Sequence, residues 1–198
     1  MRDKPRIIVG VSGATGIIYA VKLLEVLQEL GVETHFVMTK TASLTCAYEL
    51  DISVKTLRAK ADLSYSIADF TAPIASGSFN TMGMIIAPCS VRTLGEVATG
   101  VTSNLLTRAA DVTLKERRRL VMLVREFPLH LGHLKNMLAV TEMGGIIAPP
   151  VPAFYTKPET IEDLVTHTVG RTLDLFGLDA ANFLRWDEVP APENNPKS

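Results

Sequence analysis

The sequence predicts an α/β fold with a doubly wound, mostly parallel sheet, and two features predict it. Apolar segments of strand length alternate with segments of helical periodicity, which is typical of a parallel sheet with helices on both faces. In addition, residues 120–124 form an unbroken apolar run, as expected of a strand that is covered on both sides. Such a sheet places its ligand crevice at the carboxyl ends of the strands.

The length and composition are those of one ordinary globular domain. The 198 residues can bury a substantial core, and 47% hydrophobic with 21% charged residues exclude a disordered chain. A formal net charge of −1 argues against general nucleic-acid binding. No apolar run reaches membrane-spanning length, and the N-terminus lacks a secretory signal. Cys46 and Cys89 stand alone without metal-like spacing, so we expect a reduced, cytoplasmic location.

The first expected elements are a strand at residues 6–11, a glycine-containing turn and a helix at residues 17–30. Together they form a geometry that binds phosphate, because backbone N–H groups and the helix dipole favour an anion. Gly10, Gly13 and Gly16, however, do not have the spacing of the dinucleotide fingerprint. The turn is therefore either a nucleotide or phosphate site or a plain tight turn.

Four further elements are expected before the middle of the chain: a strand at 32–38, a helix at 41–50, a connecting segment with a short helix at 53–69, and a loop over a pocket at 70–78. The second strand would place Thr39 beside the first turn if the sheet is parallel.

A third buried strand is expected at residues 82–87, before Pro88. Ser90 and Thr93 then present hydroxyls and amides at a strand-to-helix junction. Cys89 in this segment is either a nucleophile or a small buried hydrophobic residue. We favour the second interpretation, because no histidine or other base is adjacent in the sequence.

A helix, a turn of basic residues and a buried strand are expected between residues 104 and 126. One helix face carries small packing residues at i, i+3, i+4 and i+7: Leu106, Ala109, Ala110 and Thr113. A different face carries Arg108, Asp111 and Lys115. The strand ends in Arg125 and Glu126, and an ion pair there would lie where open α/β folds place ligands. A capped surface strand would end in the same way.

The remaining expected elements are a loop and helix at 128–143, a short buried strand at 144–148, an extended proline-rich segment at 149–155, and a helix from Thr160 to about Phe176 that Gly177 ends. His130 and His133 are three residues apart, but without a third ligand we favour ordinary polar contacts over a metal site. Arg171 is either a surface residue or an inward-facing anion contact. Residues 187–198 would be disordered or packed on a neighbouring subunit.

The expected strand ends predict one ligand crevice. It would collect hydroxyls, amides and one cation from residues 13–15, Thr39, residues 90–93 and residues 125–126, a set that suits a mononucleotide phosphate. A second anion site is offered by Arg108, Lys115, Tyr155 and Arg171. Two anion sites separated by an acid indicate a reaction between a bound nucleotide and a second phosphorylated molecule. Composition alone does not separate this function from that of a simple flavoprotein.

Several motifs resemble those of one known family. They are V-S-G-A-T-G, A-S-G-S, A-P-C-S, N-L-L-T-R-A-A-D-V-T-L-K-E-R, V-R-E-F-P, H-L-K-N-M and P-A-F-Y. Together they resemble the UbiX-type flavin prenyltransferases, which include the small B subunits linked to aromatic-acid decarboxylases. The match runs from Ile7 to Trp186. Its specific part is the run at 104–117 with Arg125 and Glu126, whereas the glycine turn is not specific.

The resemblance implies a single Rossmann-like (flavodoxin-like), three-layer flavoprotein domain at residues 1–186 that assembles as a homododecamer. The family joins a dimethylallyl group from dimethylallyl phosphate to N5 and C6 of reduced FMN, without a metal, and passes prenylated FMN to a UbiD-type decarboxylase. The residues that match its FMN site are Gly13, Ala14, Thr15, Thr39, Ser90, Val91, Arg92, Thr93 and Arg125. Those that would grip the allylic phosphate are Lys115, Tyr155 and Arg171, supported by Arg108. Glu126 matches the acid/base residue.

The chemistry of these side chains suits those roles. A phosphate leaves readily when preorganised cations and hydroxyls meet its developing charge. An allyl cation needs aromatic faces in a dry pocket, and Phe70 and Trp186 are candidates. Trp186 would equally serve as an anchor between subunits, and Phe70 as a core residue. Glu126 would pass a proton to the departing phosphate and help remove one when the new ring closes.

The chain departs from the family pattern at a few positions. Thr15 and Thr39 stand where serine is common, and both keep the hydroxyl. Arg92 replaces a small residue, Phe127 stands where alanine or threonine is usual, and Lys135 stands where glutamate is common. These departures concern the shape of the pocket and the subunit contacts rather than the reaction class.

Three alternative functions fit the sequence less well. An FMN-dependent cysteine decarboxylase of the same fold would carry a P-A-S-A-N motif and a histidine near the first helix, whereas this chain has I-A-S-G-S and no histidine before Glu33. A flavin carrier would need no second phosphate site. An aromatic-acid decarboxylase subunit would need a group for an aromatic carboxylate, and we find none dedicated to it in the sequence.

Overall fold

The computed structural model describes residues 4–180, 183, 185 and 186. The chain forms two compact units, Met1–Pro150 and Val151–Ser198. The larger unit contains one six-stranded sheet, made of β1 (Arg6–Val11), β2 (Glu33–Met38), β3 (Leu63–Tyr65), β4 (Gly83–Cys89), β5 (Arg119–Val124) and β6 (Ile146–Ile147). All neighbouring strands pair in parallel, which confirms the expected fold class. The tail expected at residues 187–198 lies outside the described residues.

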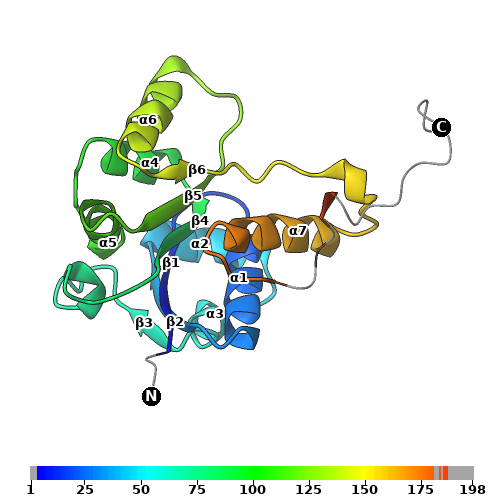
Figure 1. Cartoon of the computed structure of the whole chain (residues 1–198), viewed down its shortest axis with the longest axis horizontal. Helices are drawn as coiled ribbons and strands as arrows, with labels where there is room; N and C mark the ends of the chain where they lie inside the picture. The colour runs from blue at the N-terminus through cyan, green and yellow to red at the C-terminus, as the bar shows by residue number, and fades with distance from the viewer. Residues whose placement is uncertain (1–3, 181–182, 184, 187–198) are drawn as a thin grey trace. The chain divides into compact units, whose positions relative to one another are not determined.

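The strand order is β3-β2-β1-β4-β5-β6, as can be followed in Figure 1. The chain builds outward from β1 to β3 and then returns to place β4 on the free side of β1. This is the strand order of a Rossmann sheet, and the winding direction changes between β1 and β4. The loops that follow these two strands diverge, so open α/β sheets bind their ligands at this point.

The helices of the larger unit connect these strands: α1 (Ile17–Glu29), α2 (Lys40–Glu49), α3 (Val54–Arg58), the 3-10 turn η1 (Pro73–Ala75), α4 (Val91–Ala98), α5 (Leu105–Lys115) and α6 (Leu131–Glu142). In Figure 1, α1 and α5 lie on opposite sides of the central strands. The expected small-residue stripe of α5 is buried in the core beneath it, at Leu106, Ala109, Ala110 and Thr113. No helix within the described part of the chain is long and apolar enough to cross a membrane.

Three boundaries differ from those expected from the sequence. Residues 63–65 form the edge strand β3 inside the presumed connecting segment, and their three-residue pattern is too short for periodicity to reveal. β4 continues through Pro88 to Cys89, because its pairing with β5 resumes at Val124 after an irregularity. β6 contains only two residues, and both are half-buried rather than buried.

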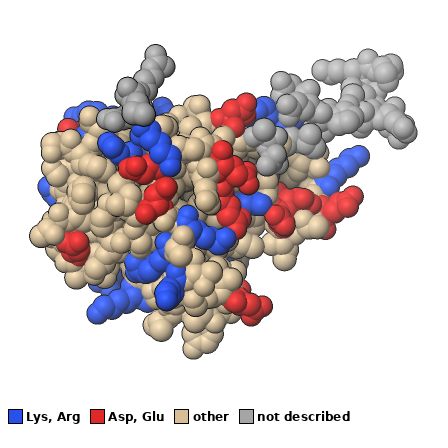
Figure 2. Space-filling model, turned by 90° about the horizontal axis from the view of Figure 1, so that it is seen from below, with Lys and Arg blue, Asp and Glu red and all other residues tan. Residues whose placement is uncertain are grey.

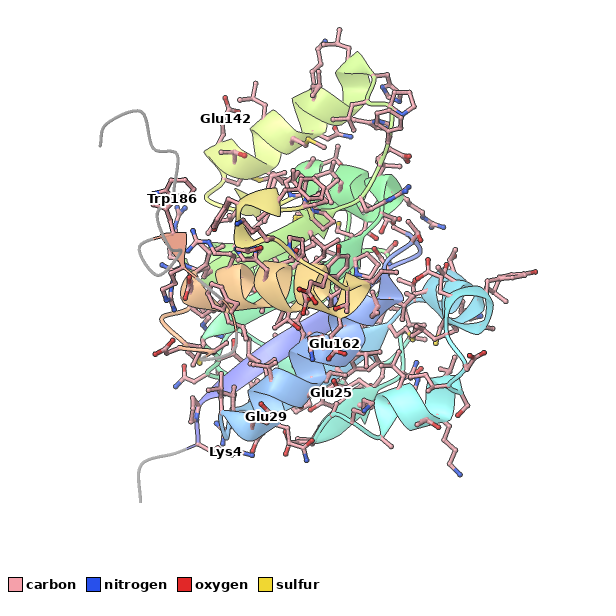
Figure 3. All side chains as sticks on the ribbon, turned by 90° about the vertical axis from the view of Figure 1, so that its right-hand side faces the viewer. Lys4, Glu25, Glu29, Glu142, Glu162 and Trp186 are labelled. Carbon is pink, nitrogen blue, oxygen red and sulfur yellow. The ribbon has the colours of Figure 1, made fainter. Side chains whose placement is uncertain are left out.

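The smaller unit contains the 3-10 turn η2 (Phe154–Thr156) and helix α7 (Ile161–Asp174). Thr160 and Asp163 open α7 as expected, because each side chain accepts a hydrogen bond from the backbone N–H of the other. Glu162, labelled in Figure 3, adds a second carboxylate to the first turn, where the helix dipole favours negative charge. Gly177 follows with φ of 68°, the left-handed conformation that ends a helix.

Charged side chains of both signs are interspersed on the face of the molecule in Figure 2. This mixture agrees with the formal net charge of −1. Any binding of a phosphate must therefore depend on local groups rather than on a broad basic surface.

Candidate active site

A cavity of about 550 Å³ opens beside the carboxyl ends of β1, β2 and β4. This is the switch point of the sheet, where the sequence predicts the ligand crevice. The residues that line the cavity are Gly13, Thr39, Lys40, Thr41, Ile67, Ser90, Val91, Arg92, Thr93, Glu96, Ser103 and Asn104. Six of the nine predicted flavin-site residues are therefore in one cavity: Gly13, Thr39, Ser90, Val91, Arg92 and Thr93.

Two helices begin at the wall of this cavity. The Thr39 hydroxyl caps α2 by accepting a hydrogen bond from the Ala42 N–H at 3.1 Å. The Ser90 hydroxyl caps α4 in the same way, from the Thr93 N–H at 3.3 Å. The first N–H groups of a helix have no acceptor within the helix, and the helix dipole adds partial positive charge there. Two such helix starts beside the same cavity make an anion site of hydroxyls and amides.

Ser12 ties the two central strands together at this edge, and the sequence analysis missed it. Its side chain is completely buried. The hydroxyl accepts a hydrogen bond from the Ser90 N–H at 2.8 Å and donates to the Pro88 carbonyl at 3.3 Å. Ser12 therefore holds the turn that presents Ser90. The sequence shows only a serine directly after a buried strand. Its partner Ser90 lies 78 residues further along the chain, so local patterns do not reveal the contact.

The first N–H groups of α1 already have an acceptor within the chain, and the predicted flavin contacts of the glycine turn stay a prediction. The Glu49 carboxylate accepts hydrogen bonds from the N–H groups of Gly16 and Ile17 at 2.9 Å. An internal carboxylate thus occupies the place where the phosphate was expected. Ala14 and Thr15 lie in this turn, outside the set of residues that line the cavity.

Glycine is required at two positions of the turn. Gly16 has φ of 106°, a left-handed conformation that favours glycine. A Cβ on Gly13 would come within 2.4 Å of the Thr41 side chain. Gly13 therefore allows the start of α2 to approach the turn, which brings that helix N-terminus to the cavity.

Arg125 and Glu126 lie at the same edge of the sheet, but they do not form the expected ion pair. The Arg125 N–H donates to the Cys89 carbonyl at 3.0 Å, which places Arg125 next to the Ser90 turn. The Glu126 carboxylate accepts a hydrogen bond from the Phe127 N–H at 3.0 Å, and no salt bridge joins it to Arg125 among the described residues. Arg125 is exposed and Glu126 half-buried, so both remain available to a ligand.

Arg92 is directed to its own helix. Its guanidinium pairs with Glu96, Nε to Oε1 at 3.0 Å, and the side chain is 80% exposed. Glu96 also accepts a hydrogen bond from the Ser103 hydroxyl at 2.8 Å. The cation that was expected near the flavin is thus partly neutralised by a carboxylate of the same cavity.

Lys115 is at the far end of α5 from the cavity. Asn104, which precedes α5, lines the cavity, whereas Lys115 is its last residue, roughly 16 Å along the axis. The Lys115 ammonium pairs with Glu116, and this hydrogen bond lowers the pKa of the Glu116 carboxyl. Arg108 pairs with Asp111 at 2.7 Å. One chain therefore does not bring Lys115 to its own cavity.

Three further predicted donor-site residues are in the smaller unit. Tyr155 lies in η2 and contacts His167, with 3.1 Å between the hydroxyl and Nε2. Arg171 lies on α7 and pairs with Asp174 at 2.7 Å, and its side chain is 58% exposed. Trp186 makes an edge-to-face contact with Tyr155. Arg171 is thus a surface residue whose guanidinium pairs with a carboxylate of its own helix.

The burial and contacts of the other candidate residues distinguish between the alternatives for each. Phe70 is 49% exposed, so the interpretation as a core residue is wrong. Cys89 is completely buried, and burial raises the pKa of its thiol, which confirms the small hydrophobic role. His130 caps α6 by accepting the Gly132 N–H at 3.0 Å and stacks on His133. His130 thus makes the ordinary polar contact that we favoured, whereas the buried Nδ1 of His133 has no hydrogen-bond partner among the described residues.

Comparison with known proteins places this fold and site in one family. The family model described as Flavoprotein matches residues 1–173. A protein from Thauera aromatica named flavin prenyltransferase UbiX is 53% identical over 181 residues, which cover 91% of this chain and 93% of that protein. The Escherichia coli K12 protein of the same name is 50% identical over 184 residues, covering 91% of this chain and 97% of the relative.

The chain belongs to the UbiX flavin prenyltransferase family. Among solved structures of that family, AnUbiX (PadA1) in complex with FMN and dimethylallyl pyrophosphate has a TM-score of 0.92 and 51% identity, covering 92% of this chain and 97% of the other. A structure described as a dodecameric FMN-dependent UbiX-like decarboxylase from Escherichia coli O157:H7 has a TM-score of 0.90 and 49% identity, covering 91% of this chain and 98% of the other.

More distant structures share only the fold. The peptidyl-cysteine decarboxylase EpiD matches with a TM-score of 0.59 at 14% identity. A PPC decarboxylase matches with the same TM-score at 22% identity. Such identities carry no argument for cysteine decarboxylation by this chain.

Proposed function

We propose that this chain is a flavin prenyltransferase that joins a dimethylallyl group from dimethylallyl phosphate to N5 and C6 of reduced FMN. The product, prenylated FMN, would serve a UbiD-type decarboxylase. The single observation that carries the proposal is the cavity at the switch point, where two capped helix starts lie together in a chain of the UbiX family. An FMN-dependent decarboxylase of the same fold was the alternative, and no group in the cavity favours it.

The residues present fit the phosphate of FMN. Thr39 and Ser90 bring hydroxyls, and the first turns of α2 and α4 bring N–H groups with the positive ends of two helix dipoles. Gly13 keeps a Cβ out of the approach to α2. The cavity, at about 550 Å³, is within the range of small-molecule sites, roughly 300–1,000 Å³. Arg125, another predicted FMN-site residue, lies next to the Ser90 turn, because its backbone N–H donates to the Cys89 carbonyl.

Reduced FMN supplies the electron-rich N5 and C6 atoms to which the allyl group becomes attached. The protein's task is to hold the flavin phosphate, orient the ring and neutralise the phosphate that leaves the donor. Thr39, Ser90 and Thr93 serve the first task. Lys115, Tyr155 and Arg171 serve the last, with support from Arg108, because their N–H and O–H groups meet the negative charge without a metal.

The donor site is completed between copies of the chain. Lys115 lies roughly 16 Å along α5 from the residue that lines the cavity, which supports its supply by a second copy. The dodecameric assembly described for the Escherichia coli O157:H7 relative supports this arrangement. We propose a homododecamer for this chain too, with the flavoprotein domain at residues 1–186. The family model supports that domain, because its match at residues 1–173 runs across both compact units.

Glu126 holds the proton that is exchanged during the reaction. Glu126 follows β5 and Arg125 directly, and its carboxylate accepts a hydrogen bond from the neighbouring Phe127 N–H. It gives a proton to the departing phosphate and takes one when the new ring closes. Phe70 and Trp186, 49% and 72% exposed, offer aromatic faces to the allyl group. We also propose a cytoplasmic location, which the two free, buried cysteines support.

The proposal is tested by mass spectrometry of the flavin after anaerobic incubation of the protein with reduced FMN and dimethylallyl phosphate. We expect flavin that is heavier by one dimethylallyl unit. A parallel incubation with dimethylallyl pyrophosphate, the compound bound to AnUbiX, identifies the preferred donor. Flavin of unchanged mass with both donors would refute the proposed function.

A further inference from the structure

The hydroxyl of Tyr155 has a specific partner in the smaller unit. It lies 3.1 Å from Nε2 of His167, in the middle of α7. The two rings are nearly perpendicular, at 85°, with centroids 5.7 Å apart, so the edge of the imidazole faces the tyrosine. Trp186, labelled in Figure 3, contacts the Tyr155 ring with centroids 5.1 Å apart. Tyr155 is thus held at its hydroxyl by His167 and at its ring by Trp186.

His167 is also beside the cation of the donor site. Arg171 is four residues further along α7, so the two side chains emerge from the same helix face. Partial burial, and then the charge of Arg171, lower the pKa of His167 and keep the imidazole neutral near neutral pH. The Phe183 ring, edge-on to His167 at 5.6 Å, contributes an apolar neighbour from the following segment.

A neutral imidazole has a single N–H, so the direction of the 3.1 Å hydrogen bond decides what Tyr155 can do. If Nε2 accepts, the only proton of the tyrosine hydroxyl is used, and Tyr155 has no donor left for an anion. If Nε2–H donates, the Tyr155 oxygen accepts and its own O–H is left to donate elsewhere. A phosphate oxygen is an acceptor, so only the second arrangement is compatible with phosphate binding by Tyr155.

We propose that His167 is a positioning residue for the donor phosphate: its Nε2–H donates to the Tyr155 oxygen and directs the Tyr155 O–H toward the phosphate. The inference rests on the proposed function, because it takes Tyr155 as a ligand of that phosphate. His167 itself contacts neither the flavin nor the donor. It acts through Tyr155, on the helix face that it shares with Arg171.

The test compares His167→Phe and His167→Gln with the wild-type protein, each with bound FMN. Phenylalanine keeps the ring but removes the donor, whereas the glutamine side-chain amide can still donate to Tyr155. Two quantities are measured: the Kd for dimethylallyl phosphate by calorimetry, and the KM and kcat of prenyl transfer. We expect His167→Phe to raise the donor Kd and KM about tenfold with a smaller change in kcat, and His167→Gln to restore most of the loss.

A double-mutant cycle with Tyr155→Phe separates positioning from packing. We expect His167→Phe to add no further loss in the Tyr155→Phe background, because the group through which it acts is gone. The matched control is Thr168→Val, since the Thr168 hydroxyl donates only to the Leu164 carbonyl of its own helix, at 2.9 Å. We expect this control to leave the donor Kd unchanged.

Two results would overturn the inference: a donor Kd that His167→Phe leaves unchanged, or losses from His167 and Tyr155 that add independently. The FMN Kd and the melting temperature of each variant show whether it is folded. Failure of the proposed function has a different signature, because wild-type protein would then yield flavin of unchanged mass whatever happens at His167. The calorimetric Kd still tests the hydrogen bond in that case.

Discussion

The Ser12→Ala substitution tests the link between the two central strands. Ser12 is completely buried, and its hydroxyl is the acceptor for the Ser90 N–H at 2.8 Å. The Pro88 carbonyl keeps a partner after the substitution, because it also accepts the Ser12 N–H at 3.1 Å. The half-buried Ser90 N–H loses its acceptor, and a fully buried N–H without an acceptor would cost about 1–3 kcal/mol, so this range is an upper bound.

The measurement is thermal unfolding of the apoprotein, with the FMN Kd measured alongside. A loss of about 1–3 kcal/mol lowers the melting temperature of a domain of this size by roughly 2–12 °C. FMN binding should weaken as well, because Ser90 both caps α4 and lines the cavity. The FMN Kd therefore reports on the same bond from the ligand side.

The matched control is Ser43→Ala in α2. The Ser43 hydroxyl donates at 3.3 Å to the Thr39 carbonyl, which also accepts the Ser43 N–H, so its removal strands no buried group. We expect the control to change stability by less than about 0.5 kcal/mol. If Ser12→Ala has the same melting temperature as the control and the same FMN Kd as the wild-type protein, the role assigned to Ser12 is wrong.

Three further predictions concern the donor site and the edge of the sheet. Glu126→Gln should retain FMN, as judged by its absorbance, yet form prenylated FMN at least about tenfold more slowly, and a normal rate would remove Glu126 from the proton transfer. Lys115→Ala should raise the KM for dimethylallyl phosphate about tenfold while the FMN Kd is unchanged; an unaltered KM would mean that no copy supplies Lys115 to the donor. Hydrogen bonding to His35, and further to Arg6, lowers the pKa of the Glu33 carboxyl, so its stabilising effect is present above about pH 4.3 and is lost as the pH falls through the lower folded-state pKa. Acid unfolding curves should therefore lose part of their steepness below about pH 4.3 in Glu33→Gln, and superimposable curves for the two proteins would contradict this.

Local patterns accounted for most elements of the larger unit. The apolar runs of β1, β2 and β5 were found within one residue of their observed bounds. β1 and β5 are apolar after their first residue, and β2 ends in the apolar run Phe36–Met38, so these patterns do not depend on distant contacts. The edge strand β3 escaped because a short, exposed strand has no continuous apolar run.

For the candidate site, too, local sequence predicted some features, whereas others depend on how distant elements pack. The positions of Thr39 and Ser90 at strand-to-helix junctions follow from the order of elements, and the parallel sheet brings them to one cavity. The sequence did not predict that Glu49 accepts the hydrogen bonds at the start of α1. Glu49 lies 33 residues beyond Gly16 and reaches it only through the packing of α2. Lys115 was predicted for a second anion site, and the sequence does not say how far that residue lies from the crevice, because the distance depends on how α5 packs on the sheet.

By itself, the sequence determined the class of fold, the chemistry available at the strand ends and, through its motifs, the family. Those properties depend on residue type and on spacing within one or two turns of chain. Only the tertiary structure decided which groups meet: Ser12 with Ser90, Glu49 with the start of α1, and Tyr155 with His167. Hydrogen bonds require atoms to approach within about 3 Å, and that proximity is set by how whole elements pack.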